Sequence, residues 1–144
     1  LQRQEIAKAY AEVISGCAWL KPQTIPENCE SSYWSYVVTL EREDITWEQF
    51  FDAFVGNGGD GFYAAWKLTY MEPFLQTMNL GGRERFLRPP FYAGELQAYG
   101  PGLCPVAEKL QPKLIQFKTS YMDVKRFEQQ LEALKITIAV FNAR

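Results

Sequence analysis

The segment Ser32-Tyr-Trp-Ser-Tyr-Val-Val-Thr-Leu40 has the pattern that decides the fold of this chain. Aromatic and β-branched residues dominate it, and such residues favour extended backbone because their side chains pack well on a pleated surface. Strand side chains alternate between the two faces of a sheet. We therefore predict a strand. Trp34, Tyr36, Val38 and Leu40 should point one way, and Tyr33, Ser35, Val37 and Thr39 the other.

Three amphipathic helices are predicted around this strand. Apolar residues recur every three or four positions in Leu1–Ser15, in Trp47–Val55 and in Asp123–Phe141. The second helix follows a capping box, Thr46 and Gln49, and Ile45 can pack against Phe50 as a hydrophobic staple. Asp123 can cap the last helix, whose predicted buried face is Val124, Phe127, Leu131, Leu134, Ile138 and Phe141.

Two further strands are predicted, Phe62–Leu68 and Leu114–Lys118, with a short helix Pro105–Gln111 before the second. Between Thr69 and Gly102, glycine and proline interrupt every period, and only short helical turns are expected, near Phe74–Met78 and Ala93–Ala98. A connection of this length in a compact domain more often has a function or contacts a partner than serves only to join two elements.

The order of elements predicts an α+β fold, a small and mainly antiparallel sheet of three or four strands covered by helices. The 144 residues suit a single domain spanning 1–144 with a substantial core. The chain opens on Leu1 inside a predicted helix, so we expect it to be part of a longer protein.

Composition excludes several classes of function. A formal net charge of −2 gives no electrostatic reason to expect a nucleic acid partner, although Arg83, Arg85 and Arg88 form a small basic cluster that could clamp a phosphate or carboxylate. No apolar run approaches the roughly 20 residues that span a bilayer, and no leader segment is evident. We expect a cytoplasmic protein without a membrane partner.

Histidine is absent, which removes Ser/His/Asp and Cys/His catalysis and histidine metal sites. Cys17, Cys29 and Cys104 are odd in number and lack paired spacing, so neither a disulfide framework nor a zinc site is expected. We expect reduced and mostly buried thiols.

The glycine turn Asn57-Gly-Gly-Asp-Gly61 admits two interpretations. Its backbone N–H groups could cradle a phosphate, or it could cap the preceding helix and turn the chain into a strand. The turn lacks the glycine spacing of a dinucleotide site and the lysine of a P-loop, which favours the cap.

A group of aromatic and polar residues follows the turn: Trp66, Lys67, Tyr70 and Glu72, with Phe74 close by. Flat apolar rings with polar edges suit sugars and planar cofactors, although core packing is the alternative. Lys67 could form a Schiff base if desolvated, but nothing distinguishes it from an ordinary solvated lysine. We predict that Trp66, Lys67, Tyr70 and Glu72 contact a substrate.

Several segments together resemble the C-terminal small domain of the DegT/DnrJ/EryC1/StrS aminotransferases, a sugar aminotransferase family. They are Arg3-Gln-Glu-Ile-Ala-Lys-Ala-Tyr10, the glycine turn before Gly61-Phe62, Tyr70-Met-Glu-Pro73 and Cys104-Pro-Val-Ala-Glu-Lys-Leu110. The cysteine-led segment is the most specific of them, and the resemblance covers nearly the whole chain.

The resemblance implies a pyridoxal phosphate enzyme of fold type I that moves an amino group from glutamate or glutamine to a keto-sugar nucleotide. It also implies that the catalytic lysine and the cofactor site belong to a large domain preceding these residues, so this chain alone holds no catalytic residue and no cofactor. The parent protein would be a homodimer.

This chain departs from the family where many relatives have a histidine-containing segment after the glycine turn. Its own segment, Trp66-Lys-Leu-Thr-Tyr-Met-Glu-Pro-Phe74, has none, which leaves room for another amino acceptor. There are two alternatives. One is a dehydratase or a non-catalytic regulator of the same family, and a histidine in place of the cofactor-binding lysine would support the dehydratase. The other is a stand-alone interaction module.

Overall fold

The computed structural model describes residues 2–64, 67–77 and 100–143. The chain divides into two compact units: a sheet unit, residues 1–65 and 112–144, and a pocket unit, residues 66–111. That the two fold as one domain stays a prediction.

The sheet unit contains a four-stranded antiparallel sheet in the order β1-β2-β4-β3. Its strands are β1 (Leu20–Pro22), β2 (Ser35–Leu40), β3 (Tyr63–Ala64) and β4 (Leu114–Lys118). Val38 of β2 lies opposite Ile115 of β4, and Ala64 of β3 lies on the other side of Ile115. The predicted α+β fold with a small antiparallel sheet is confirmed.

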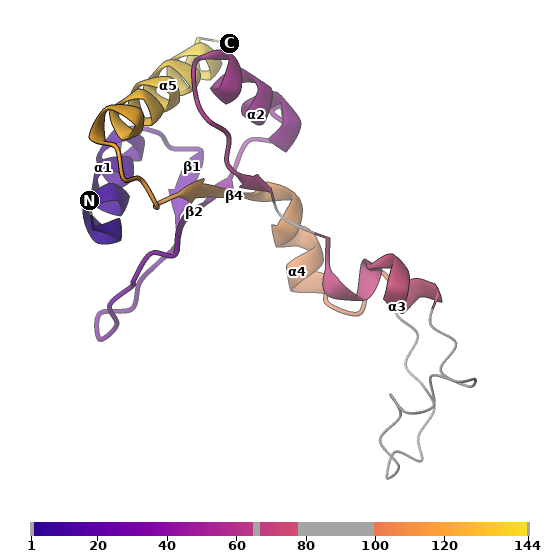
Figure 1. Ribbon diagram of the computed structural model, residues 1–144. Coiled ribbons are helices and arrows are strands. Elements are labelled where there is room, and N and C mark those ends of the chain that lie inside the picture. The colour runs from indigo at the N-terminus through magenta and orange to yellow at the C-terminus, as the bar shows by residue number, and fades with distance from the viewer. Residues whose placement is uncertain (1, 65–66, 78–99, 144) are drawn as a thin grey trace. The chain divides into compact units, whose positions relative to one another are not determined.

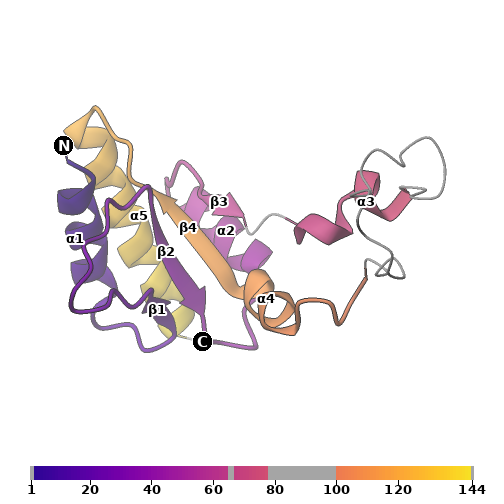
Figure 2. The ribbon, with the colours of Figure 1, turned by 90° about the horizontal axis from the view of Figure 1, so that it is seen from below.

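Three helices cover one face of this sheet: α1 (Arg3–Ile14), α2 (Trp47–Gly56) and α5 (Val124–Asn142) (Figure 1). In the view of Figure 2 the strands lie in front of α5 and α2. The predicted caps are present, because Thr46 accepts from the N–H of Gln49 at 3.2 Å and Asp123 accepts from that of Lys125 at 2.9 Å. Local sequence therefore places both helix starts.

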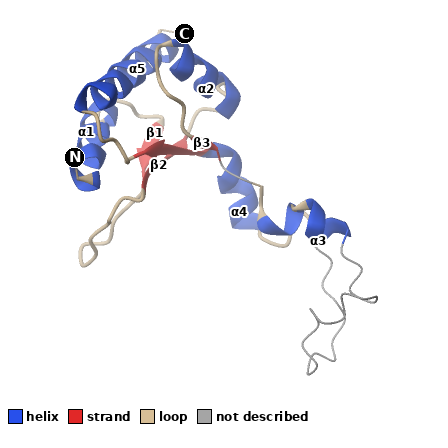
Figure 3. Ribbon diagram, in the orientation of Figure 1, coloured by secondary structure: helices blue, strands red, loops and turns tan. Residues whose placement is uncertain are grey.

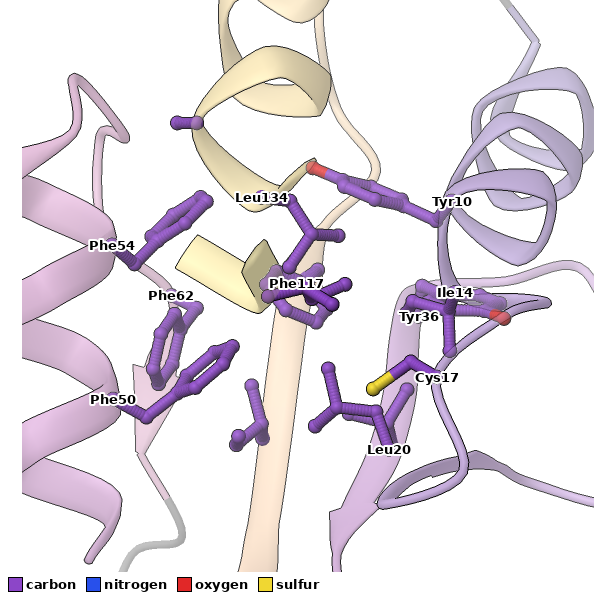
Figure 4. Packing of buried hydrophobic residues seen from close by; sticks show 14 of the residues in the cluster. Tyr10, Ile14, Cys17, Leu20, Tyr36, Phe50, Phe54, Phe62, Phe117 and Leu134 are labelled. Carbon is purple, nitrogen blue, oxygen red and sulfur yellow. The ribbon is translucent and has the colours of Figure 1, made fainter. Parts of the chain in front are cut away.

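Phe117 of β4 lies at the centre of the core, between side chains of α1 and α2 (Figure 4). Its ring stacks on that of Tyr10, with 5.1 Å between the ring centroids. It contacts the rings of Phe54 and Phe62 edge-on, with centroid distances of 5.7 and 5.5 Å. Offset-stacked and edge-to-face rings at these distances add to the free energy gained from burial alone. One side chain thus joins the sheet to two helices.

Strand β2 is shorter than the predicted strand Ser32–Leu40, and Trp34 differs in burial from the three residues predicted to point the same way. Tyr36, Val38 and Leu40 are buried, but Trp34 is 67% exposed. Tyr33 has a φ of 47°, a left-handed conformation that interrupts the alternation just before Trp34. Trp34 stacks instead on Tyr63 of β3, at 6.4 Å between ring centroids.

Strand β1 is not among the predicted elements, because Pro22 and the nearby Pro26 are typical of a loop. Pro22 lies at the end of β1, which is an edge strand, where proline is tolerated. The predicted strand Phe62–Leu68 is also too long. Only Tyr63–Ala64 is extended and paired among the described residues, and Thr69–Met71 forms the 3₁₀ helix η1.

The remaining helices, coloured in Figure 3, are α3 (Pro73–Thr77), α4 (Pro105–Leu110) and the 3₁₀ turn η3 (Gln111–Lys113). Pro105 begins α4 as predicted, and α3 matches the turn expected near Phe74–Met78. The turn expected at Ala93–Ala98 and the cluster of Arg83, Arg85 and Arg88 lie outside the described residues.

Helix α5 buries most of its predicted apolar face, but not all of it. Phe127, Leu134, Ile138 and Phe141 are buried, whereas Val124, in the first turn, is 51% exposed. Two polar side chains, Gln130 and Thr137, are buried between the apolar ones. Burying polar groups is costly unless they are hydrogen-bonded, so their partners are informative.

We predict that Phe117→Ala lowers the free energy of unfolding by about 3–5 kcal/mol, because it removes the ring that joins β4 to both helices and leaves a cavity. Urea unfolding followed by circular dichroism measures the change. Gln116→Ala, on the half-exposed face of the same strand, is the control and should cost less than about 1 kcal/mol. Equal losses in the two variants would contradict the central role of Phe117.

Candidate functional site

The glycine turn after α2 uses its backbone donors internally. The N–H groups of Asn57, Gly58 and Gly59 donate to the carbonyls of Ala53, Val55 and Phe54 at 2.9–3.0 Å. The N–H of Asp60 donates to Oε1 of Gln130 at 2.7 Å. Four successive amides are therefore occupied, which supports the helix cap and leaves none of them for a phosphate.

Two glycines of the turn have a steric reason to be glycine. Gly58 has a φ of +97°, which strains any side chain with a Cβ atom. A Cβ on Gly59 would lie 2.5 Å from the Phe54 ring, a distance no real contact reaches. The turn is thus packed directly on the core of the sheet unit.

Polar side chains of α5 and β4 fasten this turn to the sheet unit. Nδ2 of Asn57 donates to the Thr137 hydroxyl at 3.0 Å, which explains the buried threonine. The Asp60 carboxylate accepts from the Tyr121 hydroxyl at 3.0 Å and pairs with Lys118 at 3.6 Å and Arg126 at 3.4 Å. Asp60 is therefore a structural anchor that the sequence indicated only as a turn former.

The tyrosines beside Asp60 are held in their neutral form. Burial, and then the nearby Tyr10 and Asp60, raise the pKa of Tyr121 far above its ordinary value. Burial also raises the pKa of Tyr10, which is hydrogen-bonded to Tyr121. Both hydroxyls are therefore protonated at neutral pH, and that of Tyr121 donates to Asp60.

We predict that Gln130→Leu destabilises the sheet unit by about 1–3 kcal/mol, because the Asp60 N–H loses its acceptor in a partly buried place. Gln129→Leu is the matched control, since its side chain is exposed one position earlier on α5. Urea unfolding midpoints measure both. If the two variants unfold at the same urea concentration, Gln130 does not anchor the turn.

The pocket unit contains an open pocket of about 430 Å³. It is lined by residues of two segments far apart in sequence, Lys67, Leu68, Tyr70, Met71, Pro101, Glu108 and Gln111. Tyr70 and Met71 belong to η1 and Glu108 belongs to α4, and these three lie in the segments that carry the family resemblance. Apolar walls with a few polar groups are typical of small-molecule sites.

Tyr70 and Glu108 hold the two sides of this pocket together. The Tyr70 hydroxyl donates a hydrogen bond to Oε1 of Glu108. The same carboxylate accepts from the N–H of Gly102 at 2.8 and 2.9 Å and from that of Cys104 at 3.1 Å. Glu108 thereby ties the loop before α4 to η1.

These contacts, together with loss of solvent, shift the pKa values of Glu108 and Tyr70. The hydrogen bond from Tyr70, then those from Gly102 and Cys104, lower the pKa of Glu108 below its ordinary 4.5. Loss of solvent, and then the hydrogen bond to Glu108, raise the pKa of Tyr70 to about 12. At neutral pH the pair is therefore a neutral phenol donating to a carboxylate.

The four residues predicted for substrate contact fall in different places. Lys67 and Tyr70 line the pocket, Lys67 with an exposed side chain and Tyr70 buried. Glu72 is exposed at the link between η1 and α3 and is not among the described lining residues. Trp66 lies outside the described residues.

Glu108 was missed as a pocket residue, although the segment containing it was noted. The sequence signal available was its position in the first turn of a helix that begins at Pro105, where an acidic side chain can accept from backbone N–H groups. Its contact with Tyr70 joins residues 38 positions apart, which no local pattern reveals.

We predict that the carbon-detected NMR titration of Glu108 has a midpoint below 4.5, and that Tyr70→Phe raises this midpoint by removing the donor. Because the folded pKa is the lower one, the stabilisation from Glu108 is complete above the ordinary value and is lost as pH falls through the folded value. Tyr63→Phe, at an exposed tyrosine of the sheet unit, is the control and should not move the midpoint. An unchanged midpoint in Tyr70→Phe would show that the hydroxyl contact is absent in solution.

The thiols differ from the prediction that they are mostly buried. Cys17 is buried, but Cys29 and Cys104 are exposed, the first in a loop and the second at the start of α4, and all three are free. Burial raises the pKa of the Cys17 thiol, which makes it less reactive. Within the described ranges, no group of three acidic, cysteine or histidine side chains is arranged to hold a metal ion.

Among the helices that the structure describes, none is both long enough and apolar enough to cross a bilayer. Comparison of the chain with models of known protein families gives no match, and comparison with curated proteins gives none. The family resemblance therefore depends on the motifs themselves.

Proposed function

We propose that this chain is the C-terminal substrate-cleft domain of a pyridoxal-phosphate-dependent aminotransferase of the DegT/DnrJ/EryC1/StrS type. The parent enzyme would move an amino group from glutamate or glutamine to a nucleotide-linked keto-sugar. It would be a cytoplasmic homodimer, in which the large domain preceding these residues holds the cofactor and this chain supplies one wall of the acceptor cleft.

One observation carries this proposal. Two of the motifs that carry the resemblance, Tyr70-Met-Glu-Pro73 and Cys104-Pro-Val-Ala-Glu-Lys-Leu110, meet at the Tyr70–Glu108 hydrogen bond, and both contribute residues to one pocket. Their contribution to one concave surface supports the proposal. The α+β fold with an antiparallel sheet is compatible with the same family.

Neither the glycine turn nor Lys67 has the features of a pyridoxal phosphate site. The amides of Asn57 to Asp60 that could hold its phosphate are occupied by protein acceptors. Lys67 is exposed, whereas a Schiff-base lysine is activated by desolvation or by another cation. We therefore assign the cofactor, which would carry the amino group when bound, to the large domain.

The proposal is tested on the longer parent protein that it implies. We predict that it retains pyridoxal phosphate through borohydride reduction and transfers the amino group of glutamate or glutamine to a keto-sugar nucleotide, whereas the 144-residue chain does neither. Mass spectrometry of the reduced peptide and detection of the amino-sugar product measure these outcomes. Fixation of the cofactor on a lysine of this chain would overturn the division of roles, and a histidine at the cofactor-lysine position would support the dehydratase alternative.

Tyr70→Ala in the longer protein should raise KM for the acceptor by about tenfold, because a buried aromatic wall of the pocket is lost, while cofactor content stays unchanged. Tyr63→Ala is the matched control in the sheet unit and should leave acceptor KM unchanged. Tyr70→Phe keeps the aromatic ring but removes the hydroxyl that donates to Glu108. Comparing it with Tyr70→Ala separates the effect of the ring from the effect of the hydrogen bond. An unchanged acceptor KM in a folded Tyr70→Ala protein would remove this pocket from the acceptor site.

A further inference from the structure

The sheet has a second face, which is turned toward the viewer in Figure 2, with the helices of the sheet unit behind it. Ile115 and Phe117 of β4 are buried toward those helices, so Gln116 between them points to the other face. Tyr63 of β3 lies opposite Gln116 in the sheet and therefore points the same way. We call this side of the sheet the open face.

Two aromatic side chains are exposed on the open face. Trp34 is 67% exposed and Tyr63 is 42% exposed. Their ring planes are within 17° of parallel, with 6.4 Å between the ring centroids. Exposed apolar side chains scattered singly are ordinary, whereas adjoining aromatic rings form the kind of surface to which ligands bind. Trp34 and Tyr63 are called the aromatic pair below.

The backbone that presents Trp34 is held in an unfavourable conformation. Tyr33 is, among the described residues, the one non-glycine residue with a positive φ. The hydroxyl of the buried Thr119 lies 2.6 Å from the Tyr33 carbonyl oxygen and 2.9 Å from that of Trp34. The Arg3 guanidinium also donates to the Trp34 carbonyl, at 2.9 Å. Such strain persists where surrounding contacts fix it, and it concentrates at ligand sites.

Electrostatics on the open face favour an uncharged ligand. The face of an aromatic ring has negative potential, so it repels an anion and attracts polarised C–H groups or a cation. A cation would be repelled by the Arg3 guanidinium at Trp34 and by Lys118, which is two residues from Gln116 on the same face. A neutral ligand that presents C–H groups on a flat side fits both conditions.

The polar side chains beside the aromatic pair suit hydroxyl groups. Gln116 lies across the sheet from Tyr63, and Ser35 comes directly after Trp34 and also points to the open face. An amide and a hydroxyl each offer both a donor and an acceptor, which is what a ligand hydroxyl requires. No hydrogen bond joins the side chain of Gln116 or Ser35 to another residue that the structure describes.

We infer that the open face binds a neutral sugar ring, with the C–H groups of one pyranose face on Trp34 and Tyr63 and its hydroxyls on Gln116 and Ser35. The sugar class is a pyranose with equatorial hydroxyls, because its ring faces then carry C–H groups alone. This site belongs to the sheet unit, whereas the acceptor pocket belongs to the pocket unit. The inference therefore goes beyond the proposed function and does not rest on it.

The experiment is a ¹H–¹⁵N NMR titration of the 144-residue chain with cellotriose, a chain of β-linked glucose units. We expect saturable shifts of the Trp34 indole N–H and of the Tyr63 and Gln116 amides. The absence of the indole signal in Trp34→Phe assigns it. Sorbitol has the hydroxyls of a sugar but no ring, so it should cause no saturable shift. Uridine 5′-monophosphate tests the competing case of a stacked base with an anionic group.

Four variants locate the site. Trp34→Ala should raise the Kd for cellotriose about tenfold, because a stacking ring is lost, and Trp34→Phe about threefold, because a flat ring remains. Both are measured from the Tyr63 and Gln116 amide signals. Tyr63→Ala should likewise weaken binding. Val140→Ala is the matched control, since Val140 is 40% exposed but belongs to α5, and its Kd should be unchanged.

Every outcome either supports or overturns the inference. Saturable cellotriose binding that Trp34→Ala weakens and Val140→Ala does not supports it. No saturable shift with cellotriose, equal shifts with sorbitol, or equal weakening in Trp34→Ala and Val140→Ala overturns it. Binding of uridine 5′-monophosphate without cellotriose overturns it in favour of a base. An indole shift that follows protein concentration alone overturns it in favour of a second copy of the chain.

This result can be separated from the fate of the proposed function. The titration needs neither cofactor nor amino transfer, which are measured on the longer parent protein. An active aminotransferase without cellotriose binding would reject only the sugar site. Cellotriose binding with an inactive parent protein would reject only the aminotransferase.

Discussion

The packing of the Phe117 ring between two helices is the interaction on which the rest of the structure depends. Phe117 belongs to β4, which lies between β2 and β3 and comes after the pocket unit in the chain. Its contacts with Tyr10 and Phe54 join β4 to α1 and α2, which precede the pocket unit in the chain. The core of the sheet unit therefore forms only when residues on both sides of the pocket unit come together.

This arrangement has a consequence for the pocket. Ala64 of β3 pairs with Ile115 of β4, so the chain leaves the sheet for the pocket unit and returns to it on adjacent strands. A rigid scaffold that carries a variable insertion is a common way to present binding residues, because the scaffold keeps its stability while the insertion changes. The resemblance to a cleft domain is consistent with that organisation.

Two carboxylates illustrate how the surroundings assign different roles to similar groups. Asp60 is paired with Lys118 and Arg126 and accepts from Tyr121, so its charge is compensated inside the sheet unit. Glu108 is stabilised by neutral donors, the Tyr70 hydroxyl and the N–H groups of Gly102 and Cys104. In the first case ion pairs hold a turn on the sheet unit, and in the second neutral hydrogen bonds hold the loop before α4 to η1.

Local sequence alone determined the elements whose causes are local. The capping box at Thr46 and Gln49, the cap at Asp123, the proline that begins α4 and the alternation of Leu114–Lys118 all predicted their elements correctly, because each depends on residues a few positions apart. The α+β class followed from their order. The glycine turn was likewise favoured as a helix cap, since its spacing lacked the features of a phosphate loop.

Only the tertiary structure decided the features that join distant segments. Gln130 is buried because its side chain accepts a hydrogen bond from the N–H of Asp60, 70 residues away. Trp34 is exposed and stacks on Tyr63 of β3. Glu108 became part of the pocket through its contact with Tyr70, 38 positions away in the sequence. Such roles arise because a side chain's available charge and hydrogen-bonding capacity depend on what the fold places beside it, which no periodicity along the chain records.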